Sequence, residues 1–177
     1  MGNSNSERPG VALILLSGLP GTGKTTFARA LGERVELAHV ESDAIRRGLA
    51  AEPTYSARES GMVFARVETE ARQALAKGRH ALIDATNLTN RDRRRFVRLA
   101  SDTDARLIAV RLTAPEEVVR ERLGGPRDGH SQADMAVFEM MRSRPQPFPF
   151  PAIVVDTRWD LEPAIAFVLR LINDQAP

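Results

Sequence analysis

The chain of 177 residues contains no cysteine, and this absence excludes disulfide bonds and thiolate zinc sites. No apolar run approaches the roughly 20 residues that are needed to cross a bilayer. The N-terminal stretch "MGNSNSERPG" lacks the apolar core of a signal peptide. With 42% hydrophobic and 27% charged residues, the composition is that of a globular protein. We therefore expect a protein of the cytoplasm.

The sequence is also poor in net charge, in aromatic residues and in lysine. A formal charge of +2 is too small to indicate a polyanionic partner by itself. An aromatic content of 5% offers few platforms for base stacking. Lys24 and Lys77 are the only lysines, and we interpret the excess of arginine as a compositional bias. One arginine run is interpreted as a solvated helix face, or else as a guide for an anionic substrate; it comprises Arg91, Arg93, Arg94, Arg95 and Arg98.

Apolar strand patterns alternate with helical patterns along the chain. The predicted strands cover residues 11–18, 38–42, 80–84, 105–112 and 152–157. The predicted helices cover residues 24–35, 44–50, 56–77, 93–100, 116–123, 131–141 and 161–172. Capping signals precede two of the helices, at Ser56 and Thr89. Strands of this apolar kind, separated by helices, predict a doubly wound α/β fold with a five-stranded, mostly parallel sheet.

The pattern of residue types along the chain predicts one domain over residues 11–177, preceded by a disordered N-terminal segment of residues 1–10. One region departs from the alternating pattern, because glycine, proline and arginine are concentrated between Gly124 and Pro151. We interpret residues 120–150 as a mobile lid inserted late in the domain. This segment is called the predicted lid below.

The clearest motif is Gly-Leu-Pro-Gly-Thr-Gly-Lys-Thr at residues 18–25, between a predicted strand and a predicted helix. It satisfies the phosphate-binding pattern G-x-x-x-x-G-K-[ST]. Glycines let backbone N–H groups converge on an anion, and the following helix adds the positive end of its dipole. In this pattern Lys24 reaches the β- and γ-phosphates of a nucleotide and Thr25 binds Mg²⁺. The residues that we expect to bind ATP are Gly18, Gly21, Thr22, Gly23, Lys24, Thr25 and Thr26.

Two further strands end in polar residues. Ligands of open parallel sheets bind outside the carboxyl ends of the strands, so the ends of the second and third strands are candidate sites. Asp43 follows the second strand, and Asp84, Thr86 and Asn87 follow the third. Asp43 is the candidate general base for an attacking hydroxyl, and Asp84 is a candidate Mg²⁺ contact.

Each of these residues also has an ordinary structural interpretation. Asp43 could cap a helix that begins at Ala44, and Asp84 with Asn87 could cap a turn. Arg46 could hold an anionic substrate group or be a solvated helix residue. The arginines in or beside the predicted lid could close on a nucleotide; they are Arg120, Arg122, Arg127, Arg142 and Arg144. The three histidines show no metal-ligand spacing, so we expect them to be structural or exposed.

Several stretches together resemble a known family. They are "GLPGTGKTT", "SDAIRRGL", "LIDATNLTNRDRRRFVRLA", "LTAPEEVVRERLGGPR" and "VVDT". Over residues 11–157 the chain resembles small P-loop kinases related to the kinase domain of phage and bacterial polynucleotide kinases. The resemblance implies a P-loop NTPase-type three-layer sandwich with ATP and Mg²⁺ as cofactors.

By position, the resemblance implies that Asp43 is the base and that Arg46 contacts acceptor phosphate. It implies that Arg122 and Arg127 are lid arginines on the donor phosphates, and that residues 84–87 line the acceptor side. The stretch Gly124–Pro126 departs from the polar spacing of the family, so Arg120 could take the place of Arg122. The chain also lacks the phosphatase and ligase modules that often accompany such kinases.

The sequence therefore predicts an ATP- and Mg²⁺-dependent kinase that transfers the γ-phosphate to a hydroxyl. The acceptor is a polynucleotide 5′-hydroxyl or a small hydroxylated metabolite, and fold alone does not choose between them. Two alternatives stay open. One is a nucleotide-dependent switch or binding module that hydrolyses ATP slowly, and the other is a toxin-like sugar-nucleotide kinase.

Overall fold

The computed structural model describes residues 10–49, 52–125 and 135–174. Strands and helices alternate along these residues. The strands are β1 (Ala12–Ser17), β2 (Leu37–Glu41), β3 (His80–Asp84), β4 (Arg106–Thr113) and β5 (Ile153–Asp156). The helices are α1 (Lys24–Gly32), α2 (Ser42–Leu49), α3 (Ala57–Ala76), α4 (Asn90–Asp102), α5 (Glu116–Gly124), α6 (Met135–Met141) and α7 (Glu162–Asn173). The predicted N-terminal segment lies outside the described residues except for Gly10.

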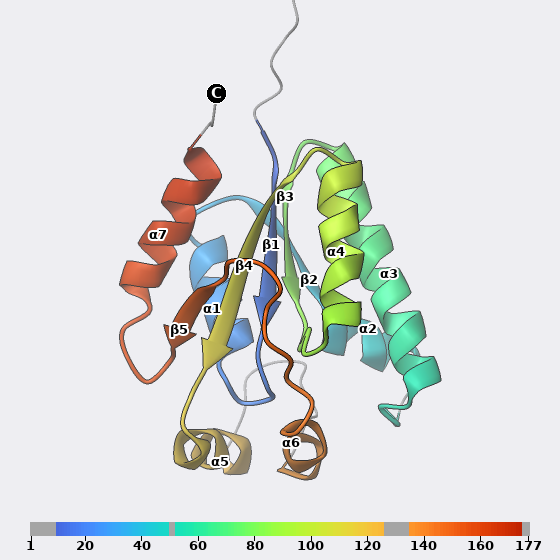
Figure 1. Cartoon of the computed structure of the whole chain (residues 1–177), viewed down its shortest axis with the longest axis vertical. Coiled ribbons are helices and arrows are strands. Elements are labelled where there is room, and N and C mark those ends of the chain that lie inside the picture. Colours follow the sequence, from blue (N-terminus) through green and yellow to red (C-terminus); the bar gives the residue numbers. More distant parts are fainter. Residues whose placement is uncertain (1–9, 50–51, 126–134, 175–177) are drawn as a thin grey trace, which may run out of the picture.

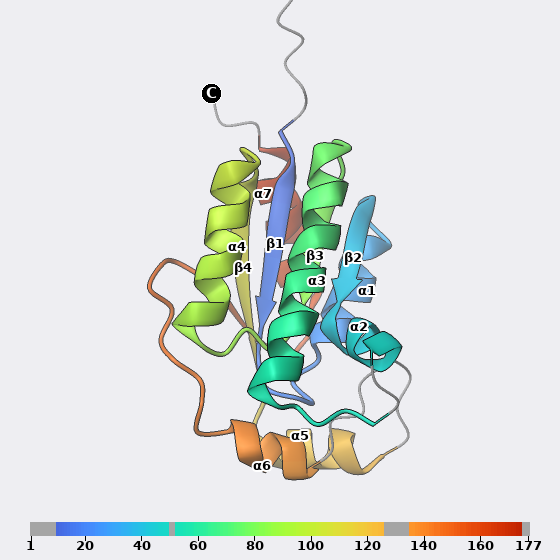
Figure 2. The same ribbon diagram turned by 90° about the vertical axis from the view of Figure 1, so that its right-hand side faces the viewer.

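The five strands form one sheet in the order β2-β3-β1-β4-β5, and every pairing is parallel. Helices α1 and α7 cover one face, and α3 and α4 cover the other (Figure 1 and Figure 2). The predicted α/β three-layer fold with a five-stranded sheet is therefore confirmed. None of the helices in the described ranges is both long and apolar enough to span a membrane.

The central strand β1 is buried along its whole length, because each of its faces packs against a different helical layer. Ile14 and Leu16 join the core beneath α1 and α7, whereas Leu13 and Leu15 join the core beneath α3 and α4. This two-sided burial explains why the strand is a continuous apolar run without alternation.

The order of the strands determines where a ligand can bind. From β1 the chain continues into α1 on one face of the sheet, and from the neighbouring β3 it continues into α4 on the other face. A crevice forms outside the carboxyl ends of two such strands, at the topological switch point. Helices α2, α5 and α6 lie at this same edge of the sheet (Figure 1).

Candidate functional site

The loop between β1 and α1 has the backbone shape that its glycines predicted. Gly21 and Gly23 have φ angles of 77° and 83°, which side chains rarely adopt. A Cβ atom at Gly18 would lie 2.6 Å from the Leu112 carbonyl oxygen, so only glycine fits there. Gly23 is also the N-cap of α1, and no side chain caps that helix. The first N–H groups of α1 are therefore available to an anion.

Lys24, the first residue of α1, is partly buried at the base of this loop. Its Nζ donates a hydrogen bond of 3.1 Å to the Leu19 carbonyl oxygen within the loop. Burial lowers the pKa of Lys24, while the negative charges of Asp84 and Asp43 oppose this shift. The ammonium group is thus poorly solvated and lies in the field of two carboxylates, one beyond β3 and one beyond β2.

The oxygens that could hold a metal meet at the end of β3. Thr25 Oγ1 donates to Asp84 Oδ2 at 2.9 Å, and Asp84 is 3% exposed. Hydroxyl and carboxylate oxygens are ligands that Mg²⁺ accepts, usually together with water and substrate phosphates. No group of three or more His, Cys, Asp or Glu side chains that could hold a metal ion occurs in the described part of the chain. The pair Thr25 and Asp84 fits an ion that a nucleotide helps to hold.

His39 is a site neighbour that sequence reasoning missed. Its Nε2 lies 3.1 Å from the same Asp84 oxygen that Thr25 contacts. His39 belongs to β2, and its register partner in β3 is Leu82, two residues before Asp84. Ligand spacing along one segment cannot reveal a contact between strands, and only the strand pairing could have indicated it.

Asp43 is the second residue of α2 and is partly buried. The alternative reading made it the cap of a helix beginning at Ala44, but α2 begins at Ser42. Over the ranges that the structure describes, no hydrogen bond or ion pair engages the Asp43 carboxylate. Nearby, burial and the charges of Asp84 and Asp43 raise the pKa of Glu41. Among the described residues, Asp43 therefore keeps an unpaired carboxylate whose charge acts on Lys24, and its role as general base stays a prediction.

Asn87 was predicted to line the acceptor side, but its side chain points into the fold. It is fully buried, and its Nδ2 donates to the Leu16 carbonyl oxygen at 2.7 Å. Its φ angle of 43° places it in the left-handed region, which asparagine tolerates better than most residues. The Thr86 carbonyl oxygen accepts from Gly18 N at 3.1 Å. These contacts tie the end of β3 to the phosphate-binding loop, so Asn87 braces the loop instead of facing an acceptor.

Arg46 is not the exposed cation that an acceptor phosphate would need. It is 6% exposed and pairs with Glu59 of α3. Burial opposes ionisation of Glu59, but hydrogen bonds from Thr54 and Arg46 outweigh it and lower the pKa of Glu59 to about 2. The Arg46 guanidinium also lies 4.6 Å from the Tyr55 ring centroid. Arg46 thus joins α2 to α3, because a guanidinium at this position meets a buried carboxylate.

Arg93 contradicts the interpretation of the α4 arginines as a uniformly solvated face. It is 1% exposed and donates to four backbone carbonyl oxygens, those of Asn87, Leu88, Gln146 and Pro147. Its guanidinium also lies 3.8 Å from the Phe148 ring centroid. Arg93 therefore joins the loop after β3 to the segment that returns from α6.

The predicted lid, residues 120–150, begins inside α5 and includes α6. Arg122 of α5 donates to Thr157 Oγ1 at 2.7 Å and contacts the Gly21 carbonyl oxygen at 3.4 Å. It therefore lies against the phosphate-binding loop, and its contact with donor phosphates stays a prediction. Arg127 lies outside the described residues.

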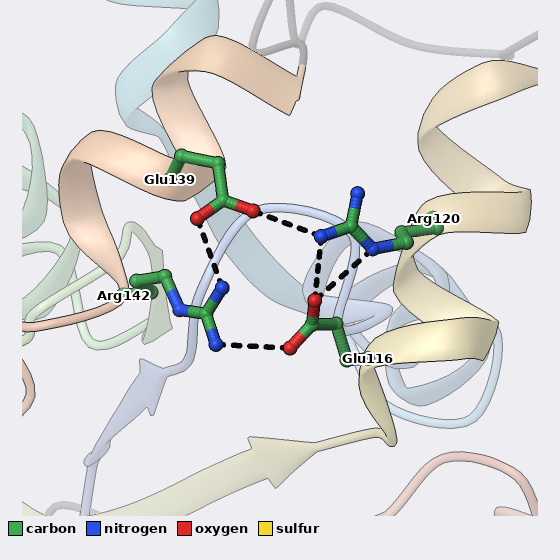
Figure 3. Close-up of polar contacts among 4 residues, drawn as sticks. All are labelled: Glu116, Arg120, Glu139 and Arg142. Carbon is green, nitrogen blue, oxygen red and sulfur yellow. Dashed lines mark hydrogen bonds and ion pairs between the residues drawn. The ribbon is translucent and has the colours of Figure 1, made fainter.

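An exposed ring of four charged side chains links α5 to α6 (Figure 3). Its members, which we call the lid ring, are Glu116, Arg120, Glu139 and Arg142. Each arginine contacts both carboxylates, and the four closest nitrogen–oxygen distances run from 2.6 to 3.0 Å. Arg120, the alternative to Arg122, is thus engaged in this ring.

Comparison with known proteins agrees with this architecture. Residues 13–148 match the model of the AAA domain family AAA_33. The chain belongs to this family. Its fold is that of P-loop kinases: it superposes on a kinase-like protein of Chloroflexus aurantiacus with a TM-score of 0.75 at 23% identity, covering 97% of this chain and 100% of the other. It superposes on the APS kinase of Mycobacterium tuberculosis, solved with AMPPNP and APS, with a TM-score of 0.72 at 17% identity, covering 94% and 99%.

The matches to two curated relatives span only part of each relative's length. The uncharacterised protein Rv2004c of Mycobacterium tuberculosis is 30% identical over 146 residues, which are 76% of this chain and 29% of that protein. The L-seryl-tRNA(Sec) kinase of Methanococcus maripaludis is 28% identical over 112 residues, which are 62% of this chain and 44% of that protein. The chain therefore spans about three tenths of the first relative and less than half of the second.

Proposed function

We propose that this AAA_33-family protein is an ATP-dependent phosphotransferase that transfers the γ-phosphate of ATP to a hydroxyl group. One observation carries the proposal: the Lys24 ammonium at the phosphate-binding loop lies in the field of two carboxylates, of which Asp43 has no partner in the described residues. A module that only binds nucleotide needs the loop but has no need of a free carboxylate beside it. A hydroxyl acceptor does need such a base.

Each residue then has one task. The open N–H groups of the loop and of α1 bind the donor phosphates, and Lys24 moves its hydrogen bond from the Leu19 carbonyl to a phosphate oxygen. Mg²⁺, held by Thr25 and Asp84, would neutralise negative charge on the phosphates. Arg122 lies against Gly21 and can add a guanidinium to the same group. Arg127 is proposed for the same task from the family resemblance alone.

In the transfer step, Asp43 accepts the proton of the attacking hydroxyl. The acceptor oxygen attacks the γ-phosphorus, the bond from that phosphorus to the leaving ADP oxygen breaks, and the hydroxyl proton passes to the Asp43 carboxylate. The acceptor would approach from the side of Asp43 and Thr86. The names of the relatives and structural neighbours range from gluconokinase to L-seryl-tRNA(Sec) kinase, so the family itself leaves the acceptor open.

The test is transfer of labelled γ-phosphate from ATP to a panel of oligonucleotides, nucleosides, sugars, sugar nucleotides and aminoglycosides. Asp43→Asn should slow transfer by roughly 10² or more while ATP still binds, and Lys24→Ala should weaken ATP binding itself. Asp104→Asn is the matched control, because Asp104 is exposed in the turn before β4, at the other edge of the sheet. Equal rates for Asp43→Asn and the parent would overturn the assignment of the base.

A further inference from the structure

A groove of about 750 Å³ runs along the exposed side of α4. Its basic lining is a stripe of four arginines, which we call the α4 arginine groove: Arg91, Arg94, Arg95 and Arg98. Spacings of three, four and seven residues place these side chains on one face of the helix. The groove is thus a linear arrangement of guanidinium groups and not a scattered surface charge.

Most of this positive charge has no partner inside the protein. The side chains of Arg91, Arg94 and Arg98 form no ion pair or hydrogen bond with any of the described residues. Within the stripe only Arg95 pairs with a carboxylate, Glu68 of α3, at 3.3 Å. Like charges four residues apart, such as Arg94 and Arg98, destabilise a helix. An anion bound in the groove would remove that cost.

The acidic residues of α4 form their contacts with residues outside the arginine stripe. Asp92 completes the capping box with Thr89, and Asp102 pairs with Arg72 of α3 at 3.1 Å. Other exposed arginines of the protein, such as Arg66 and Arg158, do have carboxylate partners. Three arginines of the stripe on α4 therefore have no carboxylate partner among the described residues.

The groove begins beside the candidate site. Its near end is lined by Asn90 and Gln146, which are joined by a hydrogen bond of 2.7 Å from Asn90 N to Gln146 Oε1. Asn90 is the first residue of α4, three positions after Asn87 in the loop that follows β3. From there α4 runs toward the opposite edge of the sheet (Figure 2). The helix rise of about 1.5 Å per residue gives a length of about 18 Å to Asp102.

We propose that the α4 arginine groove binds the phosphodiester backbone of a single-stranded nucleic acid that carries the acceptor hydroxyl. The proposal rests on the proposed phosphotransfer and specifies its substrate class. Guanidinium forks match phosphate oxygens in two-pronged hydrogen bonds. At about 3.4 Å per stacked nucleotide, the length of the groove fits roughly five nucleotides.

The lining also favours one strand of nucleic acid over other polyanions. It contains no aromatic or apolar side chain, so it suits a backbone and offers neither base stacking nor the apolar anchors that a bound peptide uses. Glu68 and Asp102 line the same groove, but each is paired with an arginine, Arg95 and Arg72 respectively. We therefore expect binding that is independent of base sequence and strongly dependent on salt.

The test is direct binding of a 3′-labelled single-stranded oligoribonucleotide of about ten nucleotides, followed by fluorescence anisotropy between about 50 and 200 mM salt. Removing two phosphate contacts with the double variant Arg94→Gln, Arg98→Gln should weaken binding about tenfold and reduce the salt slope by about 1.4. The matched control is Arg34→Gln, Arg170→Gln, which removes the same charge from the turn after α1, where Arg34 pairs with Glu162, and from α7. The control should bind like the parent, and thermal unfolding would show that both variants are folded.

Three outcomes would overturn the proposal. The α4 variant could bind as tightly as the parent, or both double variants could lose affinity equally, which would indicate unspecific attraction. An acidic peptide of the same charge could bind as tightly and with the same dependence on Arg94 and Arg98, which would indicate a protein partner. Binding of the oligonucleotide is measured without ATP, so the groove proposal and the proposed function can fail separately. If the oligonucleotide binds but no phosphate is transferred to any acceptor, the proposed phosphotransfer is overturned. If phosphate is transferred to a small hydroxyl compound but the oligonucleotide does not bind, the groove proposal is overturned.

Discussion

The arginines beneath the candidate site and those of the lid ring each join separate segments of the chain, but in opposite surroundings. Arg93 and Arg46 are 1% and 6% exposed, whereas the side chains of Arg120 and Arg142 are 52% and 47% exposed. A buried cation that loses its partners is left uncompensated in a medium of low dielectric constant. An exposed cation that loses a partner is solvated by water. The part of the site on the sheet is therefore fixed, whereas the lid ring joins α5 to α6 by exposed contacts that water and salt can replace.

The most severe way to test this comparison is to remove Arg93. Arg93→Met should lower the free energy of unfolding by about 4 kcal/mol, because four carbonyl oxygens lose their donor and two chain segments lose their link. Urea unfolding at neutral pH measures the change. Arg94→Met is the control, since Arg94 is the exposed neighbour of Arg93 and should change stability by less than about 0.5 kcal/mol. Equal midpoints for the two variants would contradict the comparison.

The ion pair of Arg46 and Glu59 should give a smaller effect that depends on pH. Folding lowers the pKa of Glu59 from 4.5 to about 2, so the stability it contributes is complete above pH 4.5 and is lost as pH falls toward 2. Glu59→Gln should cost about 3 kcal/mol at neutral pH and should flatten the acid limb of the stability curve. Stability measured against pH tests both effects, with Glu36→Gln, an exposed carboxylate, as the control. A parallel acid limb in Glu59→Gln would refute the assignment.

The contrast also explains what could be read from the sequence. The strands themselves and the phosphate-binding loop follow from local signals, because the apolar run of β1 and the glycines before Lys24 leave few alternatives. The capping box at Thr89 was likewise local, and α4 begins directly after it. Signals of this kind need only neighbouring residues.

The contacts between distant segments were not predictable. Arg93 and Arg94 are adjacent and identical in sequence, yet the first is buried by a segment more than fifty residues away and the second is exposed. Arg46 found its counter-charge on another helix, and His39 reached Asp84 from a different strand. Residue type alone does not distinguish a cation that binds a substrate from one that braces the fold.

The smallest global effect is expected from the lid ring. Glu139→Gln removes contacts from Arg120 and Arg142, but a single exposed carboxylate contributes little to global stability. The midpoint of urea unfolding should therefore not change measurably. Hydrogen exchange at the α6 amides should become faster, while exchange at the α4 amides should not change, because local opening and global unfolding are separate events.

Salt gives an independent check on the same variant. At about 1 M salt the Debye length is about 3 Å, so the lid ring of the parent should be screened and its α6 exchange should approach that of Glu139→Gln. The buried contacts of Arg93 should be insensitive to the same salt, which makes α4 the internal control. Faster exchange in both helices of Glu139→Gln would mean that the ring supports the whole fold. Unchanged exchange in α6 would mean that the small apolar cluster of Val119, Leu123 and Phe138 holds the two lid helices together without the ring, and burial rather than charge would then control the opening of the lid.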